Sequence, residues 1–415
     1  MAFIKTPVRG MPEQTPLETE LRNYVLNQIR KVYHSYGFLQ IETPAIEHIE
    51  NLTGDQGGEN EKLMFRLLKR GESLERALKE KDGELSAEGL RFDLTVPLTR
   101  FYANNMSDLP IPFKVMQMGP VWRADRPQRG RFRQFMQCDI DILGEPSKLA
   151  EIELISATVE ALSSLGFEDL VVKVNDRRIL RAMALYAGFP ADKLTDVYIL
   201  LDKMDKIGFT GLRDELIAED YSLEAIDKYL GLFRELPEST LSRAYFENNP
   251  EILSDIEVFE NLDQILSATR ALTGPEVNII FDPTLVRGMS YYTGTIFEVS
   301  LPGMAGSVAG GGRYDEMIEK YVNQPVPACG FSIGFERIIV LLEEQGLIPG
   351  FTDPRTAYLL DKDIGVDRIV EFMQEAAKRR VNGETIFMTV RRRNVRRQIE
   401  ELEELGYTQF EEISP

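Results

Sequence analysis

The sequence is poor in the residues from which several common catalytic and metal sites are built. Its 415 residues include two cysteines, two histidines and one tryptophan. Cys138 and Cys329 are too few for a disulfide framework and lack the paired spacing of a zinc site, so we expect both to be small buried apolar residues. With only His34 and His48 available, neither a histidine metal cluster nor a Ser-His-Asp triad is expected.

Long apolar runs and common nucleotide-binding glycine motifs are absent as well. No run of about 18 apolar residues occurs, and the first ten residues, MAFIKTPVRG, lack the apolar stretch of a signal peptide. The sequence contains no Walker or GxGxxG motif, which argues against a Rossmann sheet. Since 43% of the residues are hydrophobic, the chain can bury a substantial core, and we expect a cytoplasmic enzyme of two or three domains without a membrane segment.

The charge balance is acidic, with a formal net charge of -19. Such a surface argues against indiscriminate binding of nucleic acid, because non-specific affinity comes from neutralising phosphates with basic residues. Arginines nevertheless gather in two places, which are the loop with Arg123, Arg126, Arg129, Arg131 and Arg133 and the run with Arg391, Arg392, Arg393, Arg396 and Arg397. An acidic remainder would help to confine a nucleic acid to these patches.

The most informative segment is VWRADRPQRGRFRQFMQCDIDILG, residues 121–144, in which two strand-like runs flank an arginine-rich loop. Strand alternation predicts that Cys138, Ile140 and Ile142 face the core, and that the opposite face carries Arg131, Arg133, Phe135, Gln137, Asp139 and Asp141. Guanidinium groups match phosphate oxygens, an aromatic ring can stack on a purine, and carboxylates can hold a cationic group. This face therefore suits an acyl-adenylate, with an exposed hairpin and a solvated basic tip as the alternative.

A second polar segment is LRFDLTVPLTRFYA, residues 90–103. Read as a strand, it places Arg91, Asp93 and Thr95 on one side and apolar residues on the other. A carboxylate beside a threonine can bind an ammonium group. The alternative is a strand with ordinary surface polar residues.

Three later segments carry further candidates. Residues 277–300 place Arg287 before a glycine turn, where its guanidinium can reach a pocket, and Tyr291 and Tyr292 offer phenols to a ring nitrogen. The triplet Gly310 to Gly312 would let backbone approach a ligand closely, although most such triplets are loops. Residues 328–342 predict a strand that leads into a helix with Arg337 in its first turns; the alternative role for Arg337 is an ion pair with a carboxylate such as Glu336.

Periodicity and turn signals predict the remaining elements. Helices are expected over 16–36, within the charged insert 69–88, over 149–165, in most of 177–273, and near 366–379 and 395–405. Strands are expected over 38–47, with Pro44 near its end, and over 63–68, 170–176, 356–361, 384–390 and 407–413.

Taken in chain order, these segments resemble the signature motifs of class II aminoacyl-tRNA synthetases, in the form that histidyl-tRNA synthetases have. Residues 121–144 resemble the second signature motif of that class, 16–44 the first, which forms the dimer interface in the family, and 328–342 the third. Residues 277–300 resemble the family's histidine-recognition motif. The resemblance covers nearly the whole chain and is weakest in a C-terminal domain that looks shortened, which leaves contact with the anticodon open.

The resemblance implies an α+β fold, with a class II antiparallel sheet flanked by helices, a helical insertion and a small C-terminal α/β domain. The expected domains are the first part of the catalytic domain at 1–176, the helical insertion at 177–273, the second part of the catalytic domain at 274–347, and an anticodon-binding-like domain at 355–415. In the family, an insertion at this place approaches the acceptor arm of tRNA. A merely structural helical subdomain is the alternative.

The implied activity is that of a histidine-tRNA ligase, which activates histidine with ATP and transfers it to tRNA(His). No general base is needed, because the histidine carboxylate is already ionised at pH 7. By resemblance, Arg123 and Arg287 are catalytic and flank the α-phosphate. ATP would be bound by Arg123, Asp125, Arg131, Phe135 and Arg337. Histidine would be bound by Asp93, Thr95, Arg123, Gln137, Asp141, Arg287, Tyr291 and Tyr292.

The resemblance also implies partners. Mg²⁺ is expected with ATP, held largely by phosphates and waters, so no dedicated metal site is expected. A homodimer is expected, and Arg392, Arg393 and Arg396 are the candidates for tRNA contact. These arginines open a helix, where positive charge opposes the macrodipole, and a solvated charged face is the alternative reading.

Two departures and two rival functions remain open at the level of sequence. Asp125 stands where many members of the family carry glutamate, and Ser290 stands where aspartate is common. The main rival is a non-catalytic paralogue that resembles the histidine-sensing regulatory subunit of ATP phosphoribosyltransferase. Such a subunit has no need of phosphate arginines, whereas Arg123, Arg131 and Arg337 are all present here. A regulatory or tRNA-sensing protein similar to the synthetase would share them.

Overall fold

The computed structural model describes residues 3–53, 63–80, 84–235, 243–287, 291–302, 306–346 and 354–414. Ser290 and Gly288 lie outside these residues. The chain divides into two compact units: Met1–Pro12 with Val25–Val340 form one, and Glu13–Tyr24 with Leu341–Pro415 form the other. Among the helices that the structure describes, none combines the length and apolar character needed to cross a membrane.

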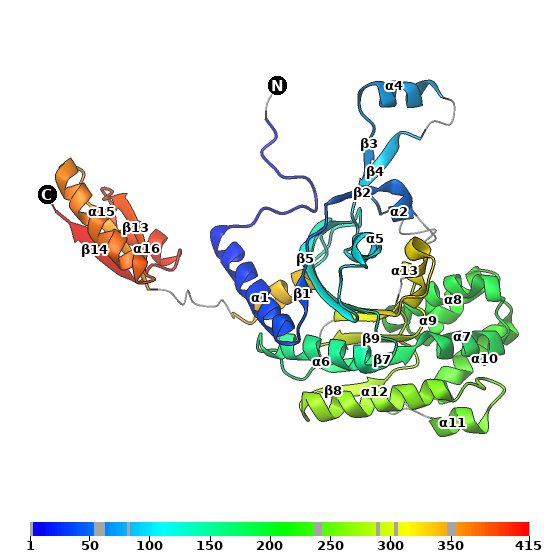
Figure 1. Ribbon diagram of the computed structural model, residues 1–415. Helices are drawn as coiled ribbons and strands as arrows, with labels where there is room; N and C mark the ends of the chain where they lie inside the picture. Colours follow the sequence, from blue (N-terminus) through cyan, green and yellow to red (C-terminus); the bar gives the residue numbers. More distant parts are fainter. Residues whose placement is uncertain are drawn as a thin grey trace. The chain divides into compact units, whose positions relative to one another are not determined.

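The largest sheet in the described part of the first unit has eight strands (Figure 1). In spatial order they are β1 (Leu39–Gln40), β5 (Phe113–Trp122), β6 (Gln134–Leu143), β11 (Ala328–Ile333), β10 (Ser307–Arg313), β9 (Thr295–Ser300), β7 (Val171–Asp176) and β8 (Asn278–Phe281). All neighbours from β5 to β7 are antiparallel, and parallel pairs occur only at the edges, β1 with β5 and β7 with β8. The predicted antiparallel sheet flanked by helices is confirmed.

Helices cover both faces of this sheet. The sheet curves around α5 (Thr95–Asn105), while α6 (Leu149–Ser163) and α12 (Glu257–Thr273) lie on the other side (Figure 1). α6 contacts β6, β10 and β11, and α12 contacts β7 and β8. On the concave side, α5 packs with α13 (Asp315–Val322) around an apolar cluster that includes Phe113 and Tyr314. The sheet thus has a buried core on each side.

The segment after β7 is helical, as its periodicity predicts. Its elements are α7 (Arg177–Ala187), the 3-10 helix η1 (Ala191–Lys193), α8 (Leu194–Leu201), α9 (Met204–Ala218), α10 (Leu223–Glu235) and α11 (Arg243–Asn248). Asp176 begins α7 by accepting a hydrogen bond from the Arg178 backbone N–H, and Gly188 ends it in a left-handed conformation with φ of +106°. α7 packs against α8 and α10.

The prediction of a strand over residues 90–103 is wrong beyond Leu90. β4 (Ser86–Leu90) ends there, and α5 begins at Thr95. Asp93 explains the difference, because its Oδ1 accepts a hydrogen bond of 3.1 Å from the Val96 N–H and so satisfies a donor that a helix start leaves free. A proline is tolerated in the first turn, where Pro97 lies. The expected division into a polar and an apolar side also fails, because all the residues from Arg91 to Val96 are buried.

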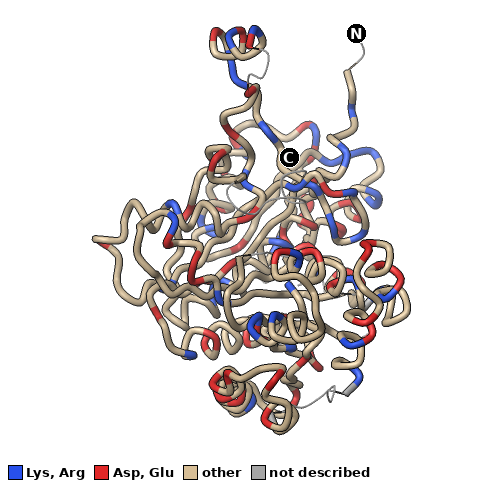
Figure 2. Tube along the Cα trace, turned by 90° about the vertical axis from the view of Figure 1, so that its right-hand side faces the viewer, with Lys and Arg blue, Asp and Glu red and all other residues tan. Residues whose placement is uncertain are grey.

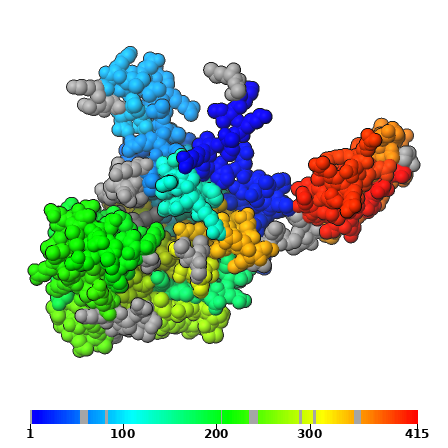
Figure 3. All heavy atoms as spheres, turned by 180° about the vertical axis from the view of Figure 1, so that it is seen from behind, coloured from blue at the N-terminus to red at the C-terminus, as the bar shows by residue number. Residues whose placement is uncertain are grey.

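Other predicted strands are shorter than expected. Residues 38–47 contribute only β1 and the start of β2 (Ile46–His48), with Pro44 between them, and residues 63–68 contribute β3 (Arg66–Leu68). β2, β4 and β3 form a separate three-stranded sheet, from which the segment with α4 (Gly71–Lys79) projects (Figures 1 and 3). α2 (Ile49–Thr53) packs on β2 and β4. The charged insert therefore contains the predicted helix, although its last residues pair in β4.

Two further predicted helices are confirmed. α1 (Pro16–Ser35) starts with a reciprocal pair in which the Thr15 N–H donates to Glu18 and the Glu18 N–H donates to the Thr15 hydroxyl. It ends before Gly37, whose φ is +81°. α14 (Phe335–Glu344) follows β11, as the pattern of residues 328–342 predicts. Cys138 and Cys329 are both buried, as expected, and they form no disulfide.

The C-terminal segment forms a small α/β fold. Three parallel strands lie in the order β13 (Thr385–Val390), β12 (Arg355–Leu360) and β14 (Gln409–Ile413). α15 (Val366–Val381) and α16 (Val395–Glu403) complete it. Separate apolar clusters surround Tyr358 and Leu359, whose side chains point to opposite faces of β12. The predicted α/β character of this segment is confirmed.

A buried ion pair joins β10 to α6. Arg313 donates to both carboxylate oxygens of Glu151, at 2.7 and 2.8 Å, and the two residues are 9% and 2% exposed. The remaining guanidinium donors reach the backbone oxygens of Glu145 and Ser147 at 3.2 and 3.1 Å. Because each charge has a partner, the pair is compatible with burial, and it fixes α6 against the sheet.

Replacing Glu151 by alanine should lower the free energy of unfolding by about 3 to 5 kcal/mol, because Arg313 would keep a buried charge without its main partner. Chemical denaturation measures the change. Glu215→Ala is the matched control: it removes the carboxylate of an exposed pair with Lys203, and its effect should stay within about 1 kcal/mol. Equal effects of the two variants would contradict a structural role for the buried pair.

Candidate active site

Two buried side-chain oxygens on the concave side of the sheet have no hydrogen-bond partner among the described residues. They are Oδ2 of Asp93 and Oε1 of Gln137, on residues that are 1% and 8% exposed. A buried acceptor without a donor costs free energy, so such atoms point to a ligand that donates hydrogen bonds. Both residues are among those predicted to bind histidine.

Three carboxyl groups are buried together at this place. Asp93, Asp139 and Asp141 are 1%, 4% and 3% exposed. Burial raises the pKa of all three, and their mutual repulsion adds to it: Asp141 and Asp93 raise the pKa of Asp139, and Asp93 raises that of Asp141. Arg123 opposes the shift at Asp93 and Asp139. A pocket with this excess of acidic groups favours a cationic ligand.

The pKa of Asp141 is raised to about 7, chiefly by burial. Tyr314 counteracts the shift by donating a hydrogen bond of 2.6 Å to Oδ1 of Asp141. The ring of Tyr314 lies 5.8 Å from that of Tyr291, which lies 4.8 Å from that of Tyr292. Tyr291 also hydrogen-bonds to Thr95. These contacts bring four predicted histidine-binding residues into one cluster.

Arginines form the other part of the site. The Arg123 Nε donates to the Phe92 carbonyl at 2.8 Å, and its guanidinium lies 5.2 Å from the centroid of the Phe135 ring. Arg337 donates from Nη1 to the Ser307 carbonyl. Both acceptors are backbone oxygens, so these hydrogen bonds orient the guanidinium groups without neutralising their charge.

Arg131 and Arg287 both lie near enough to Arg337 to repel it. Burial lowers the pKa of Arg337, and Arg131 and Arg287 lower it further. Arg131 has a long ion pair of 3.9 Å with Asp125, and Arg287 has one of 2.9 Å with Glu298. Although burial opposes it, the pKa of Arg287 is raised, by Tyr292 and by Glu298. Such a cluster of cations fits an anionic ligand with several oxygens, such as a polyphosphate.

The alternative partner considered for Arg337 has another role. Oε1 of Glu336 accepts a hydrogen bond of 3.0 Å from the Met136 N–H and so links α14 to the start of β6. Arg337 itself lies in the arginine cluster, near Arg131 and Arg287.

Glycines on the central strands make room for two of the site's charged side chains. A Cβ atom at Gly310 would lie 2.3 Å from Cζ of Arg287, and one at Gly330 would lie 2.0 Å from Oδ1 of Asp141. The triplet that begins at Gly310 belongs to strand β10 and is not a loop. The sequence suggested a close approach of backbone to ligand, and the structure adds that this backbone lies against Arg287.

Sequence reasoning missed two residues that support the site. Tyr314, which holds Asp141, follows the glycine strand directly, and its position next to Arg313 was the available signal. Ser332 lies on β11 opposite Asp139, and its Oγ is 3.2 Å from Nε2 of Gln137. A third residue, Asp139, was placed on the pocket face by strand alternation but was not assigned a ligand.

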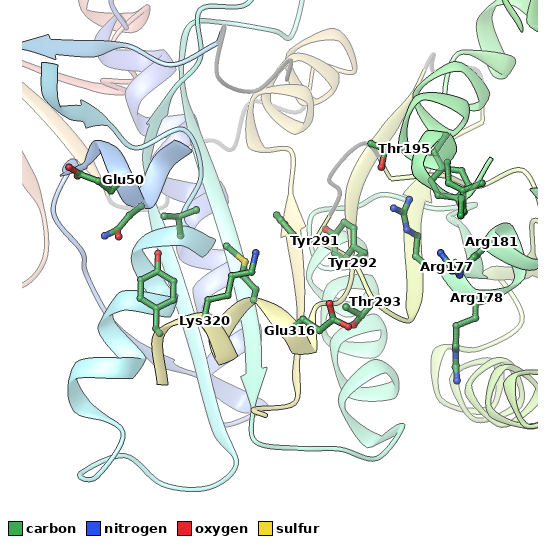
Figure 4. A pocket seen from close by; sticks show the side chains of 17 residues that line it. Glu50, Arg177, Arg178, Arg181, Thr195, Tyr291, Tyr292, Thr293, Glu316 and Lys320 are labelled. Atoms are coloured by element: carbon green, nitrogen blue, oxygen red, sulfur yellow. The ribbon is translucent and has the colours of Figure 1, made fainter. Parts of the chain in front are cut away.

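A cavity of about 670 Å³ adjoins the tyrosines. Arg177, Arg178 and Arg181 of α7 line one side and Glu316 and Lys320 of α13 the other, with Tyr291 and Tyr292 between them (Figure 4). The Arg177 guanidinium lies 4.6 Å from the centroid of the Tyr198 ring, and within the described part of the chain no ion pair is found for it. Its pKa is lowered, chiefly by burial. The size is that of a ligand pocket, and the lining is polar.

The second predicted basic site, in the C-terminal segment, is largely paired. Arg392 and Arg397 each form an ion pair with Glu401, at 2.6 and 3.1 Å, and Arg396 pairs with Glu400 at 3.2 Å. Acidic and basic residues are interspersed along the chain (Figure 2). Among the described residues, no group of three or more His, Cys, Asp or Glu is arranged to hold a metal ion.

Comparisons with known proteins agree with this arrangement. Residues 10–338 match the family model described as histidyl-tRNA synthetase. The chain is 41% identical over 421 residues to a histidine-tRNA ligase of Leifsonia xyli subsp. xyli, covering 99% of this chain and 95% of that protein. It is 38% identical over 355 residues to a histidine-tRNA ligase of Bacteroides fragilis, covering 82% of this chain and 77% of that protein.

Solved structures share the fold. The crystal structure of histidyl-tRNA synthetase from Nostoc sp. PCC 7120 superposes with a TM-score of 0.77 at 27% identity, covering 98% of this chain and 90% of that one. A structure from Bacillus halodurans, described as an ATP phosphoribosyltransferase regulatory subunit/histidyl-tRNA synthetase, has a TM-score of 0.76 at 21% identity, covering 100% of this chain and 99% of that one. The second likeness concerns the fold alone.

The raised pKa of Asp141 predicts a pH-dependent effect on stability. An unfolded aspartate releases its proton near pH 3.9, whereas folded Asp141 holds it up to about 7. Between these values the contribution of this carboxyl to stability falls as the pH rises, and it is lost above the folded pKa. Asp141→Asn keeps an acceptor for Tyr314 and removes the titration. Relative to the unsubstituted protein, the variant should gain stability between about pH 5 and about pH 8, by on the order of a few kcal/mol in denaturant unfolding. A constant difference across this range would contradict the raised pKa.

Proposed function

Because the chain belongs to the histidyl-tRNA synthetase family, we propose that it is a histidine-tRNA ligase, which joins histidine to ATP as histidyl-adenylate and then transfers the histidyl group to tRNA(His). The observation that carries the proposal is the pair of buried acceptors without donors, Oδ2 of Asp93 and Oε1 of Gln137. An amino acid's ammonium group supplies the missing donors. The arginine cluster in the other part of the site would bind the phosphates of ATP.

Histidine would bind across the acidic part of the site. Its ammonium group would donate to Asp93, Gln137 and the hydroxyl of Thr95. Because Oδ1 of Asp141 already accepts from Tyr314, Oδ2 would accept from the imidazole N–H, and Tyr292 would reach the other ring nitrogen. A site that hydrogen-bonds its substrate at several points rejects analogues lacking these groups by about 10⁴ to 10⁵.

In the first reaction step the histidine carboxylate would attack the α-phosphorus of ATP, forming a C–O–P linkage as the bond to pyrophosphate breaks. No proton has to be removed from the nucleophile, so the task of the site is to hold charge and geometry. Arg123 and Arg287 would flank the α-phosphate, and Arg337 and Arg131 would hold the terminal phosphates, with Asp125 orienting Arg131. Adenine would stack on the face of Phe135 opposite Arg123.

Mg²⁺ would enter with ATP and neutralise phosphate charge, with phosphates and waters as its main ligands. In this scheme Asp93 and Asp141 bind histidine, and Asp125 and Glu298 pair with arginines. We therefore assign no dedicated metal ligand. Glu298, which pairs with Arg287, would have to share that guanidinium with the α-phosphate.

The alternative, a non-catalytic histidine-sensing subunit of ATP phosphoribosyltransferase, has less support. The Leifsonia and Bacteroides relatives are named as ligases. A histidine sensor needs the acidic pocket, but it does not need repelling arginines such as Arg131, Arg287 and Arg337. That cluster favours the catalytic function.

For tRNA we propose two contact areas. The 3′ end of the acceptor arm would approach through the cavity beside the tyrosines, where Arg177 and Arg181 offer guanidinium groups for which no ion pair is found among the described residues. In the C-terminal segment, Arg392, Arg393 and Arg396 would bind phosphates of the anticodon stem. Their carboxylate partners are on the surface, where ion pairs contribute little, so phosphates can replace them.

We further propose a cytoplasmic homodimer formed through residues 16–44.

The proposed function predicts histidine-dependent exchange of pyrophosphate into ATP in the absence of tRNA. Arg287→Ala should lower the turnover number by about 10²- to 10³-fold, since charge stabilisation in the transition state is lost, with a smaller change in the Michaelis constant for ATP. Arg213→Ala, which breaks an exposed pair with Asp227, is the matched control and should leave exchange unchanged. A folded protein that binds histidine without exchange would favour the sensor.

Replacing Arg392, Arg393 and Arg396 together by alanine should raise the Michaelis constant for tRNA and flatten its salt dependence, because fewer phosphates are neutralised. Exchange without tRNA should stay nearly unchanged. The control is the triple replacement of Lys362, Arg368 and Lys378, which removes the same charge from the same segment. An identical salt slope in both triple variants and the unsubstituted protein would rule out the phosphate role.

A further inference from the structure

Asp139 is a buried acidic residue to which the binding scheme above gives no contact with histidine. It lies near the middle of β6, opposite Gln117 on β5 and opposite Ser332 on β11. Asp139 therefore has a strand on each side, and the residue is 4% exposed. A charge in such a place needs a reason, because burying a carboxylate without a full set of partners is costly.

The contacts of Asp139 run to Gln137. Nε2 of Gln137 lies 3.5 Å from each carboxylate oxygen of Asp139 and 3.2 Å from Oγ of Ser332. These acceptors all lie on the Nε2 side of the amide. Even with a proton on the Asp139 carboxyl, at least one of its two oxygens can only accept hydrogen bonds, so a reversed amide would bring its carbonyl oxygen against an oxygen that cannot donate to it. The Gln137 amide therefore has one favoured orientation.

This orientation decides what the pocket offers to a ligand. With Nε2 directed to Asp139 and Ser332, Oε1 is left buried and without a donor among the described residues. The same is true of Oδ2 of Asp93. An ammonium group has only donors, so it requires oxygens and would be repelled by an amide that presented its NH₂.

We propose that Asp139 is a positioning residue that holds the Gln137 amide so that its carbonyl oxygen faces the ammonium group of the bound amino acid. The inference rests on the proposed function, since it takes the pocket to be the histidine site. Asp139 acts through Gln137 and does not itself touch the ligand. Ser332 assists as the closer acceptor, at 3.2 Å from Nε2 of Gln137.

The proposal makes the preference for an amino group depend on a residue beneath the binding surface. Calorimetric titration with histidine and with 3-(imidazol-4-yl)propionate, which lacks only the amino group, measures this preference. Asp139→Ala should weaken histidine binding by about tenfold or more, the scale of one hydrogen bond to a charged group, and should leave the affinity for the propionate nearly unchanged.

Two further variants separate orientation from charge. Asp139→Asn loses the charge but keeps an oxygen that can accept from Nε2, so it should retain most of the preference that Asp139→Ala loses. In a Gln137→Ala background, Asp139→Ala should have no further effect, because the residue through which it acts is gone. Asp282→Asn, at the far edge of the same sheet where Asp282 pairs with Lys173, is the control and should bind both ligands as the unsubstituted protein does.

Three results would overturn the proposal. The first is an equal loss of affinity for histidine and for the propionate in Asp139→Ala. The second is an equal loss of the preference for histidine in Asp139→Asn and Asp139→Ala. The third is additive effects of the Gln137 and Asp139 replacements on histidine affinity. If Asp139→Ala does not fold, Ser332→Ala decides by the same comparison, with a smaller loss expected in the same direction. Pyrophosphate exchange by the unsubstituted protein tests the proposed function separately, so failure of one is distinguishable from failure of the other.

Discussion

Burial of like charges on one sheet is the constraint on which the site depends. Burial raises the pKa of Asp93, Asp139 and Asp141, and Asp93 raises the pKa of the other two further, so an added positive charge would be favourable here. The fold tolerates this burial because each group retains some support: a backbone N–H at Asp93, Ser332 at Asp139 and a tyrosine hydroxyl at Asp141. The protein is therefore organised to favour a ligand-bound state.

The same sheet also determines where the opposite charge can lie. Central strands with small residues allow long side chains to cross the sheet surface, as Arg287 does above Gly310 and Asp141 does beside Gly330. A Cβ atom at either glycine would occupy the position of the charged group itself. The acidic and basic parts of the site are thus held by backbone that can adjust little, which is the condition for positioning groups with precision.

The hairpin and the helices could be predicted from sequence because their signals are local. The alternation of residues 134–143 predicted both the strand and its polar face, and glycines marked the ends of α1 and α6. The failure at Thr95 has a local cause as well. Alternating polar and apolar residues also fit a loop that enters a helix, and the capping role of Asp93 is visible only once the helix is known.

The supporting residues could not be predicted in this way, because their contacts join distant parts of the chain. Tyr314 reaches Asp141 from 173 residues away, and Ser332 reaches Gln137 from 195 residues away. Strand order and register decide these pairs, and neither follows from the pattern of a single segment. The signal available in sequence was limited to small and polar residues inside apolar strands.

The way an arginine is held affects how much of its charge remains available to an anion. Arg313 and Arg178 are anchored by buried carboxylates, which orient the guanidinium and neutralise its charge. Arg123 and Arg337 are anchored by backbone carbonyls, which orient the group and leave most of its charge uncompensated. The second kind keeps more of its attraction for an anion, whereas Arg287, which pairs with Glu298, would have to share its guanidinium with a phosphate. Since the C-terminal arginines are of the first kind but on the surface, an anion could compete there only where solvent already weakens the ion pair.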